Sequence, residues 1–448
     1  MKIIVKRSGG LAIGIMLLLL LCCAPVHAVV DGIEGTTFNL VAKQDFISTP
    51  DGDSLLMWGY APDGGTMQYP GPTLIVPQGA LITVNLTNEL PAVHGQNVSI
   101  VFPGQVVEAS SNNPAAAVEG ALALEAPPDG TTQVTYQFIA SEPGTYLYRS
   151  GTRPDLQVEM GLVGALVVRS STPSVPDGRA YTDMIHYAYN HPDTAYHHEY
   201  LYLVTEADAA IHKLIEDGRL AEVDMTQWHP VHWFINGRSF PDLLQAPYAP
   251  WYPTQPYNCV PRIHPFEKML IRVVAAGQQL HPMHYHGQDF SVIAMDGRVL
   301  SSNGGPAGPD LAYKGSTLRF VPGQTADMIW EWTGKDLGWD PYGHVPGDDP
   351  LEGYEYTSDG GTTYPDHTVP FPVVLAERDD LAFGQFWSGS PFLGMTGDLP
   401  AGHPGTNNGG GYLFPWHSHS ERELTSNDVF PGGALSFVIL EHPFTPIP

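Results

Sequence analysis

Short runs of β-branched and aromatic residues, each closed by Pro, Gly or Asn, recur along almost the whole chain. Examples are GPTLIVPQGALITVNLTNEL (71–90), TTQVTYQFIA (131–140) and MGLVGALVVRS (160–170). Such runs predict strands, and the 48 Gly and 42 Pro supply the turns that an all-β chain needs. Hydrophobic residues make up 43% of the chain, which argues against disorder. The best helical pattern covers residues 206–223.

Composition divides the chain into two strand-rich units, and we expect each of them to be a β-sandwich. The first unit covers residues 29–170, STPSVPDGR (171–179) is the linker, and the second unit covers residues 180–448. Residues 108–130 and about 333–411 are too long for ordinary connections between strands. They are therefore expected to be insertions.

The first residues have the pattern of an export signal. Lys2, Lys6 and Arg7 precede the apolar run LAIGIMLLLLLCCAPV, which ends in VHA. This pattern predicts a signal peptide over residues 1–28 and a periplasmic, extracellular or cell-surface protein. No later segment is apolar enough to span a bilayer, so no membrane span is expected in the mature chain. Cys259 is the one cysteine beyond the signal, which excludes an internal disulfide.

The chain is strongly acidic, with a formal net charge of −27. Removal of the predicted signal would take away three further positive charges. Such a chain repels nucleic acid and anionic lipid surfaces. The partners that its charge favours are metal ions and cationic proteins, including a redox or envelope protein.

Two His-x-His motifs lie in the second unit. HPMHYHG contains His281, His284 and His286, and WHSHS contains His417 and His419. Residues i and i+2 of a strand share one face, and paired strands lie about 4.8 Å apart. If the two motifs lie on neighbouring strands, four imidazoles converge. Imidazole suits Cu, Zn, Fe or Ni, so the motifs predict a metal site.

These motifs, together with GPTLIVPQGALITVNLTNELP, FINGRSFPD and VPGQTADM, resemble the multicopper oxidases of the cupredoxin superfamily. The resemblance implies an all-β chain of two cupredoxin-like Greek-key β-sandwiches with copper as the cofactor. It places His281 at a type 1 copper position and His284 at the type 2 position. The type 3 positions fall on His286, His417 and His419.

The chain departs from the family's pattern at most of the other ligand positions. Ser418 stands where the type 1 Cys belongs, and Glu423 stands where the second type 1 His belongs. The four His expected in the first unit are replaced by Val101, Pro103, Arg149 and Gly151. The family reduces O₂ with four electrons that enter through the Cys-bound copper, so laccase-type turnover is not expected. We expect one or two copper ions rather than four, with zinc as the alternative metal.

Other polar residues are weaker candidates. Near the second motif, three carboxylates could orient the imidazoles, namely Glu421, Glu423 and Asp428. Adjacent residues on a strand face opposite sides, so His197 and His198 should point apart. Packing roles are favoured for His229 and His232. The long insertion could add a ligand from His344, His367 or His403.

The sequence therefore predicts an exported copper-binding, multicopper-oxidase-like protein with residual oxidoreductase activity. The main alternative is a catalytically inactive cupredoxin scaffold or partner-binding protein of the cell envelope. A third alternative is a mononuclear copper enzyme that resembles nitrite reductases, although the missing Cys counts against it. The resemblance leaves a dimer or a trimer open.

Overall fold

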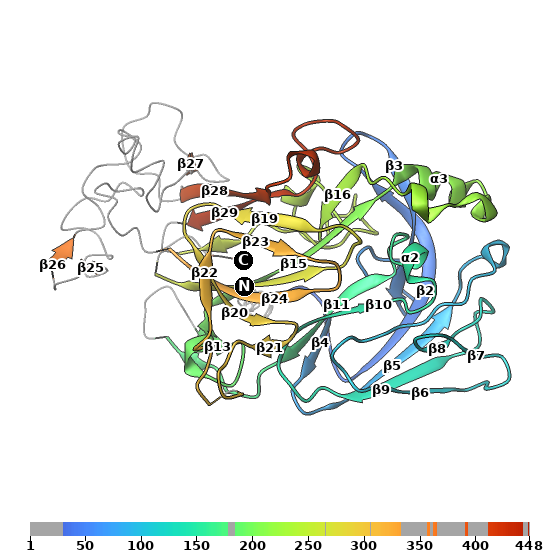
Figure 1. The fold of residues 1–448 in the computed structure, drawn as a ribbon, viewed down its shortest axis with the longest axis horizontal. Coiled ribbons are helices and arrows are strands. Elements are labelled where there is room, and N and C mark those ends of the chain that lie inside the picture. The colour runs from blue at the N-terminus through green and yellow to red at the C-terminus, as the bar shows by residue number, and fades with distance from the viewer. Residues whose placement is uncertain are drawn as a thin grey trace, which may run out of the picture.

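The computed structural model describes residues 30–177, 184–264, 266–304, 306–332, 356–358, 362–364, 390–392, 411–441 and 447. The predicted signal peptide lies outside the described residues, as do His344, His367, His403 and most of the predicted insertion at 333–411. The described chain forms two β-sandwiches, which confirms the predicted fold class (Figure 1). No helix within these residues has the length and hydropathy needed to cross a membrane.

The first sandwich pairs a four-stranded sheet, β1-β4-β11-β10, with a five-stranded sheet, β3-β2-β5-β9-β6. Their bounds are β1 (Ile33–Glu34), β2 (Thr37–Ser48), β3 (Ser54–Pro62), β4 (Leu74–Pro77), β5 (Leu81–Asn88), β6 (Glu108–Ser111), β9 (Val134–Ile139), β10 (Gly144–Arg149) and β11 (Val163–Arg169). Strand β6 lies inside the predicted insertion at 108–130, and it pairs with β9. Part of that segment therefore completes a sheet. Its remaining strands are β7 (Val118–Glu119) and β8 (Leu124–Glu125).

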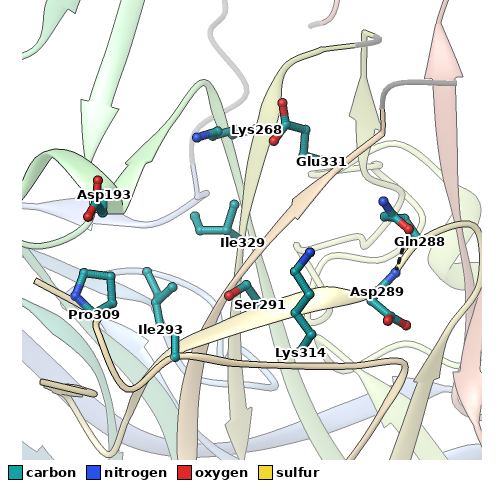
Figure 2. Close-up of a pocket in the computed structure, with 11 residues that line it drawn as sticks. Asp193, Lys268, Gln288, Asp289, Ser291, Ile293, Pro309, Lys314, Ile329 and Glu331 are labelled. Atoms are coloured by element: carbon teal, nitrogen blue, oxygen red, sulfur yellow. Dashed lines mark hydrogen bonds between the residues drawn. The ribbon is translucent and has the colours of Figure 1, made fainter. Parts of the chain in front are cut away.

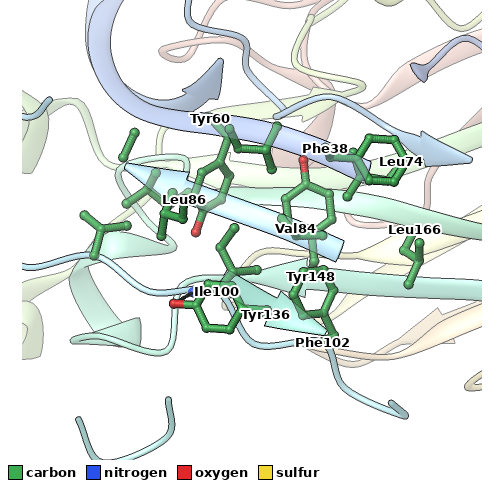
Figure 3. Packing of buried hydrophobic residues seen from close by; sticks show 14 of the residues in the cluster. Phe38, Tyr60, Leu74, Val84, Leu86, Ile100, Phe102, Tyr136, Tyr148 and Leu166 are labelled. Carbon is green, nitrogen blue, oxygen red and sulfur yellow. Dashed lines mark hydrogen bonds between the residues drawn. The ribbon is translucent and has the colours of Figure 1, made fainter. Parts of the chain in front are cut away.

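Alternation along the strands builds the first core. In β5, Ile82, Val84 and Leu86 are buried while the residues between them are partly exposed. This period of two sends one face of the strand inward. Aromatic rings fill the space between the sheets (Figure 3). Two buried tyrosine hydroxyls find backbone acceptors. Tyr60 donates to the Ser99 carbonyl at 2.9 Å, and Tyr148 donates to the Pro72 carbonyl at 2.6 Å.

The second sandwich combines the sheet β16-β15-β18-β24-β20-β21, extended by β22, with the sheet β17-β29-β28-β19-β23, extended by β27. Their bounds are β15 (His198–Ala207), β16 (His232–Ile235), β17 (Arg262–Ile263), β18 (Lys268–Ala275), β19 (His281–Tyr285), β20 (Phe290–Met295), β21 (Arg298–Val299), β22 (Tyr313–Gly315), β23 (Thr317–Phe320), β24 (Thr325–Glu331), β27 (Ser390–Phe392), β28 (Gly411–Ser418) and β29 (Leu435–Glu441). The three strand runs given from the sequence overlap β4 and β5, β9 and β11, all in the first sandwich.

Short elements connect the sheets. Three strands that lie between the two sandwiches in the sequence form a small sheet, β12 (Val175–Pro176), β13 (Met184–Tyr187) and β14 (Ala195–Tyr196). Strand β25 (Tyr356–Ser358) pairs with β26 (Thr362–Tyr364). The helices are η1 (Ala92–His94), α2 (Pro154–Gln157), η2 (Pro192–Thr194), α3 (Ala209–Glu216), η3 (Leu220–Glu222), η4 (Met225–Gln227), η5 (Asp242–Leu244) and η6 (Glu421–Leu424). The boundary predicted at 171–179 stays a prediction, because residues 178–183 are not described.

The helix predicted over 206–223 is present but shorter, as α3. Residues 206–207 instead complete β15, because they pair with β16. Asp208 caps the helix by accepting a hydrogen bond from the Ala210 N–H at 2.9 Å. Gly218 adopts φ 73°, a left-handed conformation that ends helices.

A buried layer joins the two sandwiches. Its apolar members come from both units, namely Val30, Ile75, Leu147, Val158, Val163, Ala165, Val167, Leu201, Leu203, Val274 and Ala276. Beside them the buried Arg272 donates to Glu199 at 2.8 Å and to the Thr145 hydroxyl at 3.0 Å. Thr145 belongs to the first unit, so this polar contact fixes how the units meet.

Candidate metal centre

Strands β19 and β28 bring the two His-x-His motifs together. The strands are antiparallel neighbours, and His284 lies opposite His417 in their register. Because side chains alternate, the residues between the histidines point the other way: Tyr285, Trp416 and Ser418 are buried. The two motifs therefore present their imidazoles on one face of the sheet, as the sequence predicted.

The four rings form a compact group around His284. Its ring centroid lies 4.7 Å from that of His286, 5.1 Å from His419 and 5.6 Å from His417. His286 and His417 lie 5.1 Å apart by the same measure. His284 is 4% exposed, His286 and His417 are partly exposed, and His419 is exposed. The group is thus anchored in the sheet and reaches its surface.

Within this group, His286 and His417 point their Nε2 atoms at each other, 3.1 Å apart. The Nδ1 of His417 donates to the Ser418 carbonyl at 2.7 Å, since a carbonyl can only accept. The lone pair of His417 is therefore on Nε2, where it accepts a hydrogen bond from the Nε2–H of His286. To offer Nε2 to a metal ion, His286 would have to carry its proton on Nδ1 instead. An ion about 2.05 Å from both nitrogens would see them at about 100°, between square-planar and tetrahedral angles.

His284 is held in the form that binds metals. Its Nδ1 lies 2.6 Å from the hydroxyl of Thr317, the residue opposite it on β23. Burial, followed by the neighbouring His417 and His419, lowers the pKa of His284 to about 4. The ring is therefore neutral at physiological pH and can offer a lone pair.

The group is close to a metal site without forming a complete one. Among the described residues, the three metal-binding side chains whose ligand atoms all lie within 4.8 Å of one another are His198, His264 and Glu267. They lie elsewhere in the second sandwich and do not belong to the four-imidazole group. In the four-imidazole group, His286 and His417 are aligned as a pair. His284 or His419 must rotate to add a third nitrogen.

The structure places His281 apart from these four. Its Nδ1 lies 2.9 Å from Glu423 and its Nε2 lies 2.9 Å from Glu206, and all three side chains are fully buried. Burial would lower the pKa of His281, but the two carboxylates outweigh it and raise the pKa to about 9. Both ring nitrogens of His281 therefore contact carboxylates. His281 and Glu423, which the resemblance places at type 1 copper positions, form an ion triad with Glu206 instead.

Two of the first unit's replacement residues, Val101 and Gly151, pack closely together. Val101 and Arg149 lie opposite each other in an isolated β-bridge. A Cβ atom on Gly151 would lie 2.8 Å from the Cγ1 of Val101 and 3.1 Å from the Ser99 hydroxyl. A histidine at position 151 would therefore force this segment apart. Arg149 donates to the Ser150 carbonyl at 2.9 Å and lines a cavity of about 340 Å³ at the junction of the units.

The other candidates from the sequence have different neighbours. Glu421 and Asp428 are exposed, whereas Glu423 orients His281 rather than the four-imidazole group. His229 contacts Arg422, and the Nδ1 of the buried His232 lies 3.0 Å from the Ser426 hydroxyl. These contacts agree with the packing roles expected for both.

An open cavity of about 350 Å³ lies over β18, β20, β22 and β24. Figure 2 shows acidic and basic side chains interspersed around it, among them Lys268, Lys314, Asp289 and Glu331. Its described lining residues include no histidine. The mixed charge favours neither an anion nor a cation, so we assign this cavity no role in the metal centre.

Sequence reasoning missed Glu206, His264 and Glu267. Glu206 lies in the helical pattern at 206–223, yet it belongs to the last two residues of β15 and contacts His281. His264 and Glu267 flank a proline in RIHPFEK, a local pattern that carries no metal signature. The only signal was weak: three histidine or glutamate residues, which can bind metals, lie within a few residues of strand ends.

Comparison with known proteins supports the resemblance. Residues 64–173 match a sequence model of the family described as multicopper oxidase. The blue copper oxidase from Nitrosomonas europaea superposes with a TM-score of 0.52 at 18% identity, covering 90% of this chain and 85% of that one. The multicopper oxidase mgLAC gives a TM-score of 0.52 at 18% identity, covering 93% of this chain and 88% of the other. No curated protein matches in sequence. The chain thus has the cupredoxin fold, and its resemblance to multicopper oxidases is confirmed over the matched segment.

Proposed function

We propose that this chain is an exported copper-binding protein that uses a reduced multicopper-oxidase site. His284, His286, His417 and His419 hold one or two copper ions in this proposal. The observation that carries it is the 3.1 Å approach of His286 Nε2 and His417 Nε2, with His417 fixed by its own Nδ1 hydrogen bond. Zinc is the alternative metal, because neutral imidazoles suit both.

Bound copper would supply one-electron redox chemistry at this surface. The chain's own residues limit that chemistry. Ser418 offers no thiolate, and His281 is held between two carboxylates. Gly151 and Val101 close the first unit's ligand positions. In this proposal, oxidoreductase activity is limited to what one or two copper ions support, because the Cys-bound copper through which electrons enter in the family is missing. We do not propose four-electron reduction of O₂.

Export rests on the N-terminal pattern of the sequence. A periplasmic or cell-surface location would give the protein access to copper and to a cationic redox or envelope partner. The exposed side of the four-imidazole group, at His419, is where an ion or a partner would approach.

The experiment is a copper titration of the full chain at neutral pH, with metal content measured after dialysis and oxygen uptake followed in parallel. Replacing His417 and His419 together by Ala should weaken copper binding at least tenfold, since it removes one member of the aligned pair and the exposed ring. Ser418→Ala is the matched control, because this side chain points to the opposite face and its loss should leave copper binding unchanged.

The alternative is a scaffold that kept the fold and lost the metal. The incomplete three-ligand geometry of the four-imidazole group favours it. Equal copper affinity in the double variant and in the parent would refute the copper proposal and leave the scaffold. In that case the imidazoles serve as hydrogen-bonded surface residues.

A further inference from the structure

A second group of metal-binding side chains lies at the other end of the second sandwich. It consists of His198, the first residue of β15, with His264 and Glu267 from the turn between β17 and β18. Strands β15 and β18 are parallel neighbours, and His198 pairs with Met269 in their register. This pairing sets the start of β15 beside the turn that carries His264 and Glu267.

One ligand atom from each of the three side chains lies within 4.8 Å of the other two. The Nε2 of His198 is 2.7 Å from Glu267 Oε2, and the Nδ1 of His264 is 3.2 Å from Glu267 Oε1. Ligand atoms about 2.05 Å from a tetrahedral ion are about 3.3 Å apart. Small rotations of the two rings would therefore open this geometry around an ion.

The group is built into the fold and remains accessible. The side chain of Glu267 is 0% exposed and that of His264 is 5% exposed, whereas His198 is 16% exposed. The His264 backbone N–H donates to Glu267 Oε2 at 3.0 Å, which fixes the carboxylate. A buried, oriented carboxylate with two imidazoles and a solvent-facing side has the composition of a three-ligand site with one open position.

A second buried carboxyl group lies near these three side chains. Glu441, at the end of β29, is fully buried and pairs with Arg262 at 2.5 Å. Glu441 also interacts electrostatically with His264. The neighbourhood of His264 thus contains two buried carboxyl groups, Glu267 and Glu441.

This group is remote from the four-imidazole group. Glu206, which contacts His281, lies eight residues further along β15 from His198. At about 3.3 Å per residue, the two ends of this strand are about 26 Å apart. Strand β29 also runs from one group toward the other. Its first residue, Leu435, pairs with His417, and its last residue, Glu441, lies near His264. The two groups are therefore separate and can be tested independently.

We propose that His198, His264 and Glu267 bind one divalent first-row cation, Zn²⁺ being the ion whose three-ligand geometry with an open position they match. The group offers two imidazoles and one buried carboxylate as ligands. A bound cation would stabilise the fold here or activate a water molecule at the open position. The proposal does not depend on copper binding by the four-imidazole group.

The test is calorimetric titration with Zn²⁺ alone at neutral pH. The full chain carrying His417→Ala and His419→Ala is the background, because it disables the four-imidazole group. We expect one Zn²⁺ to bind, and His198→Ala to weaken it at least tenfold. His197→Ala is the matched control: His197 is adjacent and similarly buried, but it contacts Asp177 at 3.1 Å and the Lys268 N–H at 2.7 Å.

A second variant and a second measurement guard against misfolding. Glu267→Gln keeps the shape of the side chain and should also abolish Zn²⁺ binding. Zn²⁺ should raise the thermal unfolding temperature of the background protein but not that of His198→Ala or Glu267→Gln. No Zn²⁺ binding in the background, or equal affinity in the His198→Ala and His197→Ala proteins, would overturn the proposal. The group would then be an ion pair that fixes the turn before β18.

Discussion

Replacing Glu423 by Gln should destabilise the protein in acid and neutral solution but not in alkali. The change removes one of the two carboxylates beside His281 and keeps the side-chain size. The folded pKa of His281 is raised from 6.5 to about 9. A raised pKa means that the protonated ring stabilises the fold fully below pH 6.5. This contribution falls as the pH rises through about 9 and is absent above it.

The size of the effect follows from that shift. A change from 6.5 to about 9 corresponds to about 3.5 kcal/mol, since one pKa unit is about 1.4 kcal/mol. The ring is fully buried, so solvent screens the interaction little. Glu206 and Glu423 lie at the same distance of 2.9 Å, and together they also offset the lowering by burial, so each supplies at least half of the net rise. Loss of Glu423 should therefore cost at least about 1.5–2 kcal/mol at pH 6, with the 3–5 kcal/mol found when a buried pair is broken outright as the upper bound.

The assay is urea unfolding of parent and variant at pH 6 and pH 10, followed by tryptophan fluorescence. Glu421→Gln is the control, because Glu421 lies in the same turn but is exposed, and it should change stability by less than about 0.5 kcal/mol. An equal loss of stability at both pH values in the Glu423→Gln protein would refute the reasoning. The carboxylate would then act through packing and not through the charge of His281.

Three further outcomes are expected. Ser418→Cys should give no intense copper–thiolate absorption in copper-loaded protein, because position 418 faces the interior and His281 is already bound on both nitrogens; a strong visible band would contradict this. Gly151→His should lower the free energy of unfolding by about 2 kcal/mol in urea titrations, because its Cβ would lie 2.8 Å from Val101; unchanged stability would show that the segment can open. Cys259 should resist thiol reagents until the chain unfolds, since burial raises its pKa; rapid labelling of native protein lacking residues 1–28 would show that it is accessible.

Local sequence determined the fold class and the position of the strands. Turn residues and alternating side chains act over a few residues, so the runs at 71–90 and 160–170 predicted β4, β5 and β11 directly. The convergence of His284 with His417 followed from the same alternation once the strands were taken as neighbours. The helix at 206–223 was overextended because residues 206–207 complete β15, a long-range pairing that the helical pattern does not contain.

Tertiary structure decided which charged groups meet. Glu206 and Glu423 are 217 positions apart in the chain, and both reach His281 only because β15, β19 and η6 come together there. His198 and Glu267 meet because two parallel strands begin side by side, although 69 positions separate them. Alternation tells which face of a strand a side chain occupies, but it does not tell which distant side chain lies opposite. That choice depends on the packing of whole sheets, so the ion triad and the second cation site could be found only in the folded chain.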